Sequence, residues 1–352
     1  MTGRQIDYLN ILLLGLAFVV ALLVPFEAFL FSYAVLGPLH YITEISWLNQ
    51  RDFFLSKRRH AAFLILACLV LSAQAIYFTV SGHSLVDEIP KVHIGAILSL
   101  QLFLGSLLFL AFFTTFTLLK TKTATNFYSW LLLIVFIVLG AQIYLPDQYA
   151  IFSLMLPTLI HVSVFTAIFI LSGALKQNTP SGYLVFVLYL VVCALFFIPG
   201  IILPVASHIS DYGRSAYLES GFDRLNQRLL EMMTPASQTP AEAKGQIDIL
   251  QHPFGFRVQA FIAFAYTYHY LNWFSKTGMV GWHRLPKKRL GAILALWLAS
   301  MAVYAYDYRV GLAVLLFFSL LHVILEFPLN HKVMGQVAVD LRKRLDLKRF
   351  RA

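Results

Sequence analysis

The sequence predicts an all-α fold: a polytopic integral membrane helix bundle of about ten transmembrane helices, with both termini in the cytoplasm. Of the 352 residues, 59% are hydrophobic and only 12% are charged, whereas a soluble domain carries about a quarter charged residues. The mean hydropathy is +0.74. Cys68 and Cys193 both lie in apolar runs, which argues against a disulfide framework. These observations exclude a soluble globular domain and a disordered chain.

The spans are predicted as mostly apolar segments of about twenty residues, the length that crosses a bilayer as a helix. The ten segments are 8–24, 27–48, 61–80, 94–118, 127–145, 151–174, 182–204, 256–275, 290–306 and 309–330. The stretch 8–48 is too long for one span, and Pro25 marks a tight hairpin between the first two.

The loop charges predict the orientation of these spans. One side comprises the N-terminus and residues 49–60, 119–126, 175–181, 276–289 and 331–352. That side carries twenty of the 27 Lys and Arg residues, and the other side carries seven. Because cytoplasmic loops are enriched in Lys and Arg, we expect both termini inside, in a bacterial inner membrane. Topology and contact with anionic membrane lipid then explain the net charge of +10, and no nucleic-acid partner is expected.

The predicted organisation has four parts. Residues 1–204 hold helices 1–7, 205–255 form an extracytoplasmic loop, 256–330 hold helices 8–10, and 331–352 are a basic cytoplasmic tail. The loop contains apolar residues at helical spacing, which predict an amphipathic helix on the membrane surface. They are Leu218, Phe222, Leu225, Leu229 and Met232. Such a helix either caps the connection or forms a lid over a substrate entrance.

Four histidines lie well inside predicted spans, where ionisable side chains are costly and usually functional. They are His40, His161, His269 and His322, each on an even-numbered span. Three lie about thirteen residues from the outer end of their span and His161 about ten, a spread of about 5 Å in depth. Shared depth on helices of one direction predicts that their side chains converge.

Imidazoles from separate helices are suited to hold a metal in a bundle core. Glu44 and Glu326 each follow a histidine by four residues, so each shares a helix face with it and can ligate the metal or orient the imidazole. Tyr266 and Asn272 flank His269 by three residues and are expected to orient it or to bind substrate.

The helices that carry two of these histidines contain prolines. Pro38 and Pro157 precede His40 and His161 and predict kinks there.

The ligand set contains nitrogen and oxygen but no sulfur, which favours iron, with zinc or copper as other options. Haem with axial histidines is an alternative cofactor.

The stretch from Gly37 to Glu44, GPLHYITE, resembles the glycine-proline-histidine segment of the Brp/Blh membrane β-carotene dioxygenases. That family places an acidic residue one turn after the histidine, and its intramembrane histidines are proposed to bind iron. The resemblance implies iron ligation by the four histidines. Tyr41 and Glu44 stand where the family has glycine and aspartate.

Three functions remain open at this point. The first is a membrane metal oxidoreductase or oxygenase acting on an apolar small molecule such as a carotenoid or lipid. The second is a haem-binding electron-transfer protein. The third is a proton- or ion-coupled transporter that uses the intramembrane His and Glu residues.

Overall fold

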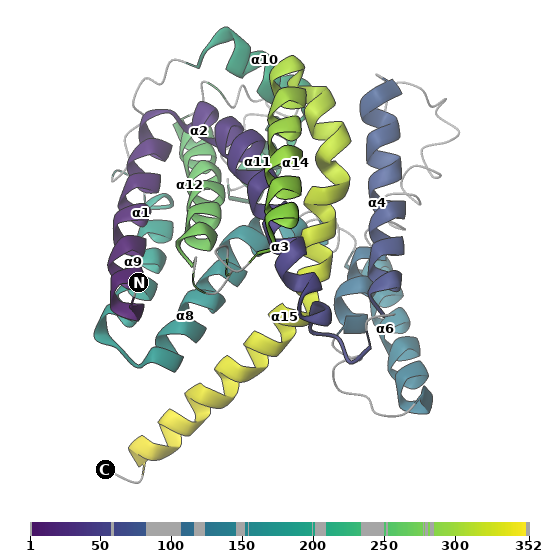
Figure 1. Cartoon of the computed structure of the whole chain (residues 1–352), viewed down its shortest axis with the longest axis vertical. Coiled ribbons are helices and arrows are strands. Elements are labelled where there is room, and N and C mark those ends of the chain that lie inside the picture. Colours follow the sequence, from purple (N-terminus) through teal and green to yellow (C-terminus); the bar gives the residue numbers. More distant parts are fainter. Residues whose placement is uncertain are drawn as a thin grey trace. The chain divides into compact units, whose positions relative to one another are not determined.

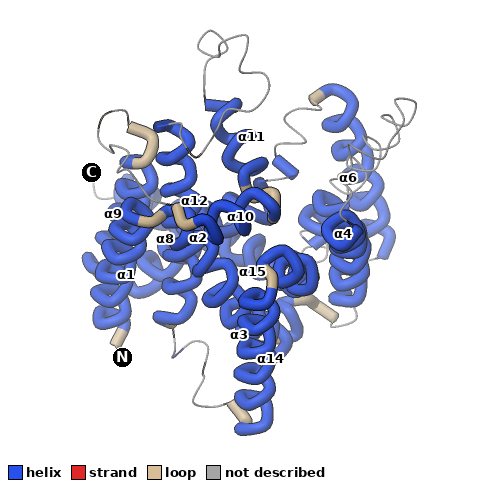
Figure 2. Tube along the Cα trace, turned by 90° about the horizontal axis from the view of Figure 1, so that it is seen from above, coloured by secondary structure: helices blue, strands red, loops and turns tan. Residues whose placement is uncertain are grey.

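A computed structural model describes most of the chain. The described residues are 2–57, 60–81, 107–115, 124–145, 152–153, 155–198, 200, 209–233, 250, 253–276, 278, 281 and 285–349. Every regular element among them is a helix, and this described part contains no strand (Figure 2). The prediction of an all-α fold is confirmed.

The helices have the following bounds. They are α1 (Gly3–Leu23), α2 (Pro25–Phe31), the π-helix η1 (Ser32–Leu36), α3 (Gly37–Asn49), the 3-10 turn η2 (Asp52–Phe54), α4 (Ala61–Ser81), α6 (Ala124–Tyr144), the π-helix η5 (Leu156–Phe165), α8 (Thr166–Gln177), α9 (Pro180–Leu195), α10 (Asp211–Glu219), α11 (Asp223–Met233), α12 (Pro253–Ser275), α14 (Lys287–Tyr306) and α15 (Tyr308–Arg349). Of the predicted fourth span, 94–118, only 107–115 is described, and it is helical.

Several of these helices are compatible with a membrane protein. Four runs in the described part are long and apolar enough to cross a bilayer: Gly3–Leu23, Leu156–Gln177, Lys287–Tyr306 and Tyr308–Leu345. Large apolar side chains such as Leu12 (68% exposed) and Phe136 (65% exposed) lie on helix surfaces, where a water-soluble protein would place polar groups. The count of ten spans and the side on which the termini lie stay predictions.

Local sequence explains where several helices begin and end. Thr2 and Gln5 form a capping box at the start of α1. Pro25 opens α2 at its first position, where a missing N–H costs nothing. Thr179 caps α9 through Gly182, and Asn178 ends α8 in the left-handed conformation.

Two π-helical segments interrupt the helices that carry His40 and His161. The segment η1 ends just before Gly37 and Pro38, and η5 contains both Pro157 and His161. Proline removes a backbone donor and clashes with the preceding turn, which favours a local change of register. Such π segments occur frequently at functional sites.

The chain divides into two compact units. Unit 1 comprises Met1–His40 and Val162–Arg309, and unit 2 comprises Tyr41–His161 and Val310–Ala352. In unit 1, α12 contacts α1, α2, η1 and α11. Its residues Ala260, Ala263, Phe264 and Ala265 are completely buried. Because other helices surround α12, it can carry polar side chains that a lipid-facing helix could not.

Unit 2 contains α4, α6, the helix at 107–115 and α15. The thiol of Cys68 on α4 donates to the Phe317 carbonyl of α15 at 3.5 Å. Phe112 packs edge-on against Phe327 with ring centroids 5.0 Å apart. The helix at 107–115 also packs against α6, through the buried side chains of Phe109, Ile134 and Val138.

The last helix is longer than predicted. The sequence analysis ends the tenth span at residue 330, whereas α15 continues to Arg349 over 42 residues, with Pro328 inside it. Figure 1 shows the yellow C-terminal half of α15 leaving in a different direction from its green N-terminal half. Within the described residues, the basic tail is therefore a continuation of this helix.

The outer loop holds two short helices, where the sequence analysis predicts one over 218–232. Gly221, with φ of 70°, separates α10 from α11. Residues 205–208, 234–249 and 251–252 of this loop lie outside the described part.

These two helices contact the bundle through a polar network. The Tyr217 hydroxyl donates to Gln259 Oε1 at 2.7 Å, and Asn226 Nδ2 donates to the Gly255 carbonyl at 3.2 Å. All three side chains are almost fully buried, and burial raises the pKa of Tyr217. The buried residues Asn226 and Leu230 thus form the contact face of α11. Leu218 of α10, one of the apolar residues of the predicted amphipathic helix, is 44% exposed.

Candidate metal centre

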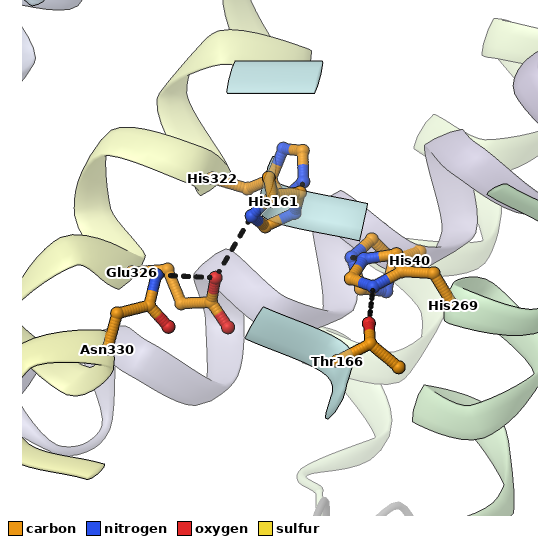
Figure 3. A network of polar contacts seen from close by, with 7 residues as sticks. All are labelled: His40, His161, Thr166, His269, His322, Glu326 and Asn330. Atoms are coloured by element: carbon orange, nitrogen blue, oxygen red, sulfur yellow. Dashed lines mark hydrogen bonds and ion pairs between the residues drawn. The ribbon is translucent and has the colours of Figure 1, made fainter. Parts of the chain in front are cut away.

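In unit 1, His40 of α3 faces His269 of α12. Their Nε2 atoms lie 3.1 Å apart, and the ring planes are inclined by 69°. The Nδ1 atom of His269 is 2.8 Å from Thr166 Oγ1 (Figure 3). His40 is 1% exposed, and the rings of Tyr270 and Trp273 pack against it. His40 is therefore enclosed, whereas His269 is half-buried and has the hydroxyl of Thr166 beside its far nitrogen.

In unit 2, His161 of η5 faces His322 of α15. Their Nε2 atoms lie 3.2 Å apart, and Nδ1 of His161 is 3.2 Å from Glu326 Oε2. Asn330 donates from Nδ2 to the same carboxylate oxygen at 3.2 Å (Figure 3). All four side chains are buried. This pair has the same arrangement as the first, with a carboxylate in place of the hydroxyl.

Helix geometry explains the second arrangement. His322, Glu326 and Asn330 follow each other at intervals of four residues on α15, so they share one face of the helix. Glu326 is thereby held between the amide of Asn330 and the imidazole of His161.

Both pairs have the spacing of imidazoles that ligate one metal in neighbouring positions. Two nitrogens bonded to a metal at about 2.0–2.1 Å lie roughly 3 Å apart when their bonds are at a tetrahedral or right angle. Metal-bound imidazoles also commonly donate their other N–H to a carboxylate, carbonyl or other acceptor. Glu326 stands in that position behind His161, and Thr166 stands there behind His269.

The same distances argue against a haem between the members of a pair. Axial ligands lie on opposite sides of the iron, so their nitrogens would be roughly 4 Å apart for bonds of about 2 Å. Separations of 3.1 and 3.2 Å are too short for that geometry. The nature of any bound cofactor stays a prediction.

The structure thus brings the four predicted histidines together as two pairs, one in each unit. The expectation that all four hold one ion stays a prediction. Glu326 contacts His161, whereas the sequence analysis paired it with His322 of the same helix, and its role as a ligand or orienting group stays a prediction. Glu44 is buried, at 1% exposure, and lies four residues after His40 on α3. Its role as a ligand or orienting group also stays a prediction.

Asn272 and Tyr266 have partners other than the histidines. Asn272 donates to Asn10 Oδ1 of α1 at 2.7 Å, and Asn10 also contacts Ser275. The ring of Tyr266 packs against Phe29. Asn272 therefore joins α1 to α12, and a role for either residue in substrate binding stays a prediction.

Comparison of the chain with protein-family models, curated proteins and solved structures finds no match. The resemblance of the segment around His40 to the Brp/Blh family therefore stays a prediction.

Two functional candidates escaped the sequence analysis. Asn330 carried a detectable signal, because it lies four residues after Glu326 in an apolar span. Thr166 carried none, since a single threonine in an apolar helix usually bonds to its own backbone.

Proposed function

We propose that the chain is an integral membrane oxidoreductase with a non-haem metal, iron in the first place and zinc or copper as alternatives, acting on an apolar small molecule such as a carotenoid or a lipid. The observation that carries the proposal is the facing of Nε2 atoms at 3.1 and 3.2 Å in two histidine pairs, in which His40, His161 and His322 are buried and His269 is half-buried. Helices compatible with a bilayer fit a substrate that dissolves in lipid.

The chain's own residues would hold and orient the ligands. His40, His269, His161 and His322 would offer Nε2. Thr166 Oγ1 lies 2.8 Å from Nδ1 of His269 and Glu326 Oε2 lies 3.2 Å from Nδ1 of His161, positions from which each would accept the N–H of a metal-bound imidazole. Histidine with carboxylate is the ligand set of non-haem iron oxygenases, and Glu44 and Glu326 are buried carboxylates. Bound iron would supply the activation of dioxygen, which serves as the oxidant.

An activity assay tests this function. The purified chain is reconstituted in lipid with β-carotene and supplied with Fe²⁺. The visible absorbance of the carotenoid should then decrease only when dioxygen is present. The His269→Ala variant should lose the activity, because it removes a ligand. The control His60→Ala, which changes a histidine of the segment before α4, should keep it. Equal rates in both variants and wild type would contradict the proposal.

A proton relay is the second candidate. His322, His161 and Glu326 form a chain of three contacting titratable groups inside two predicted spans, 151–174 and 309–330, which is also an arrangement of proton pathways. Liposomes loaded with a pH-sensitive dye distinguish the two candidates. A relay predicts proton flux that Glu326→Gln abolishes without any bound metal, and the metal site predicts no such flux.

A further inference from the structure

A pocket of about 310 Å³ lies within unit 1, away from the residues assigned to the histidine pairs. Three walls form it: the run α2–η1, the start of α10, and the junction of α14 with α15. Its volume is at the lower end of the range for small-molecule sites. The start of α10 forms part of the wall, so the pocket lies beneath a helix of the outer loop.

Glu27 is the charged residue of the pocket lining. Its Oε1 accepts the backbone N–H of Ser210 at 2.8 Å. Its Oε2 is a buried atom that has no hydrogen-bond partner among the described residues. A buried carboxylate oxygen without a donor is costly, so this atom favours a ligand that brings a donor or a positive charge.

The approach of α10 to Glu27 is close and specific. A Cβ added at Gly213 would lie 3.2 Å from Glu27 Oε1 and 2.9 Å from Ser210 Oγ. Ser210 also caps α10, accepting from the Gly213 N–H at 3.0 Å. The first turn of α10 thus holds one carboxylate oxygen in place, at the edge of a pocket that Glu27 itself lines.

The rest of the lining is apolar and aromatic. Leu30, Phe31 and Met301 line it together with Tyr304 and Tyr308. Tyr308 donates its hydroxyl to the Leu30 carbonyl at 3.0 Å, and its ring lies 4.9 Å from that of Tyr304. Aromatic faces beside a carboxylate suit a cation, and the aliphatic side chains suit an apolar body.

We propose that this pocket binds a primary ammonium group attached to a small apolar body, with the ammonium donating to the carboxylate of Glu27. Two sources carry this chemistry: a free amine, and the headgroup region of an aminophospholipid. The proposal is independent of the metal site.

The test uses the full chain in nanodiscs of phosphatidylcholine, which has no primary amine. Binding of hexylamine and of its neutral analogue hexanol is measured by saturation-transfer NMR. We expect the amine to bind at least about tenfold more tightly than the alcohol, because a hydrogen bond to a charged group is stronger than one between neutral groups. Equal binding of amine and alcohol would overturn the proposal.

Three variants make the test specific. Glu27→Gln keeps the acceptor for Ser210 and removes the charge, so amine binding should fall about tenfold or more. Ala305→Phe fills the pocket and leaves the carboxylate, and it should also weaken binding. The matched control Glu219→Gln changes an exposed carboxylate of α10 and should leave binding unchanged. Unchanged binding in Glu27→Gln, with the thermal unfolding midpoint unchanged, would refute the site.

The source of the amine is separated by a second lipid. In nanodiscs that contain phosphatidylethanolamine, competition that weakens hexylamine binding identifies a lipid headgroup as the occupant. Undiminished hexylamine binding identifies a free amine. If Glu27→Gln proves unstable, Ala305→Phe alone decides, and full binding in that variant contradicts the proposal.

Discussion

His161 and Glu326 are joined through Nδ1 and Oε2 at 3.2 Å, while the opposite nitrogen of the same imidazole faces His322. A neutral imidazole that donates from Nδ1 to a carboxylate presents a lone pair at Nε2. In the proposed metal site the carboxylate would prepare His161 as a ligand, and Asn330 donates to the same carboxylate oxygen. The arrangement leads to predictions for each residue in it.

Replacing a proposed histidine ligand should lower the affinity for the metal more than replacing a residue that contacts the opposite nitrogen of that histidine. We expect His322→Ala to lower the affinity for the bound metal by more than about 100-fold, because it removes a ligand rather than an orienting group. Metal content of the purified protein, measured by mass spectrometry of the elements, checks this. The control His60→Ala should retain wild-type content, and equal losses in both variants would indicate general misfolding.

Replacing Glu326 or Thr166, which contact the imidazoles of His161 and His269, should lower the affinity for the metal by an intermediate amount. Glu326→Gln and Thr166→Val keep the shape of each side chain and should weaken metal binding about 10–100-fold. Competition with a chelator of known affinity measures the change. Thr158→Val, a matched change eight residues before Thr166, should have no effect. A loss at Glu326→Gln as large as that at His322→Ala would make Glu326 a ligand.

The network around Gln259 should stabilise the outer helices. Gln259→Leu leaves the buried Tyr217 hydroxyl and the Asn226 amide with fewer partners, so the free energy of unfolding should fall by about 2–4 kcal/mol. Denaturant titration in detergent micelles checks this. Tyr217→Phe removes one donor and should cost about 1 kcal/mol. The control Gln336→Leu, at an exposed position of α15, should change the free energy of unfolding by less than about 0.5 kcal/mol.

The orientation of the chain is tested by cysteine labelling in a background that lacks Cys68 and Cys193. A membrane-impermeant maleimide added to whole cells should label Ser215→Cys of α10 and should not label Lys57→Cys. Both positions are exposed, so accessibility reports the side of the membrane. Labelling with the opposite pattern would invert the topology.

The sequence predicted helices well because apolar length determines them. Segment 290–306, for example, corresponds to α14 (Lys287–Tyr306). The predicted tenth span ends at residue 330, but α15 continues to Arg349, because the change from apolar to basic residues at His331 ends an apolar stretch and carries no helix-breaking signal. The π segments were also missed, although Pro38 and Pro157 indicated a disturbance at those points.

The histidines were predicted as candidates from their depth, but their pairing could not be. Which of them face each other depends on how α3 packs against α12 and how η5 packs against α15, and residue spacing along one helix contains no such information. The role of Thr166 behind His269 depends on the same packing. Asn330 could have been found, since it continues the four-residue spacing of His322 and Glu326.

X-ray absorption spectroscopy of the purified wild-type protein, loaded with iron in its membrane-like environment, tests the proposed metal site most directly. The proposed site predicts at least one iron per chain, with multiple-scattering features of at least two imidazoles at a metal–nitrogen distance of about 2.0–2.2 Å. These features should be lost or reduced in His322→Ala. A wild-type protein that retains no stoichiometric iron, zinc or copper, or whose bound metal lacks imidazole scattering, would contradict it.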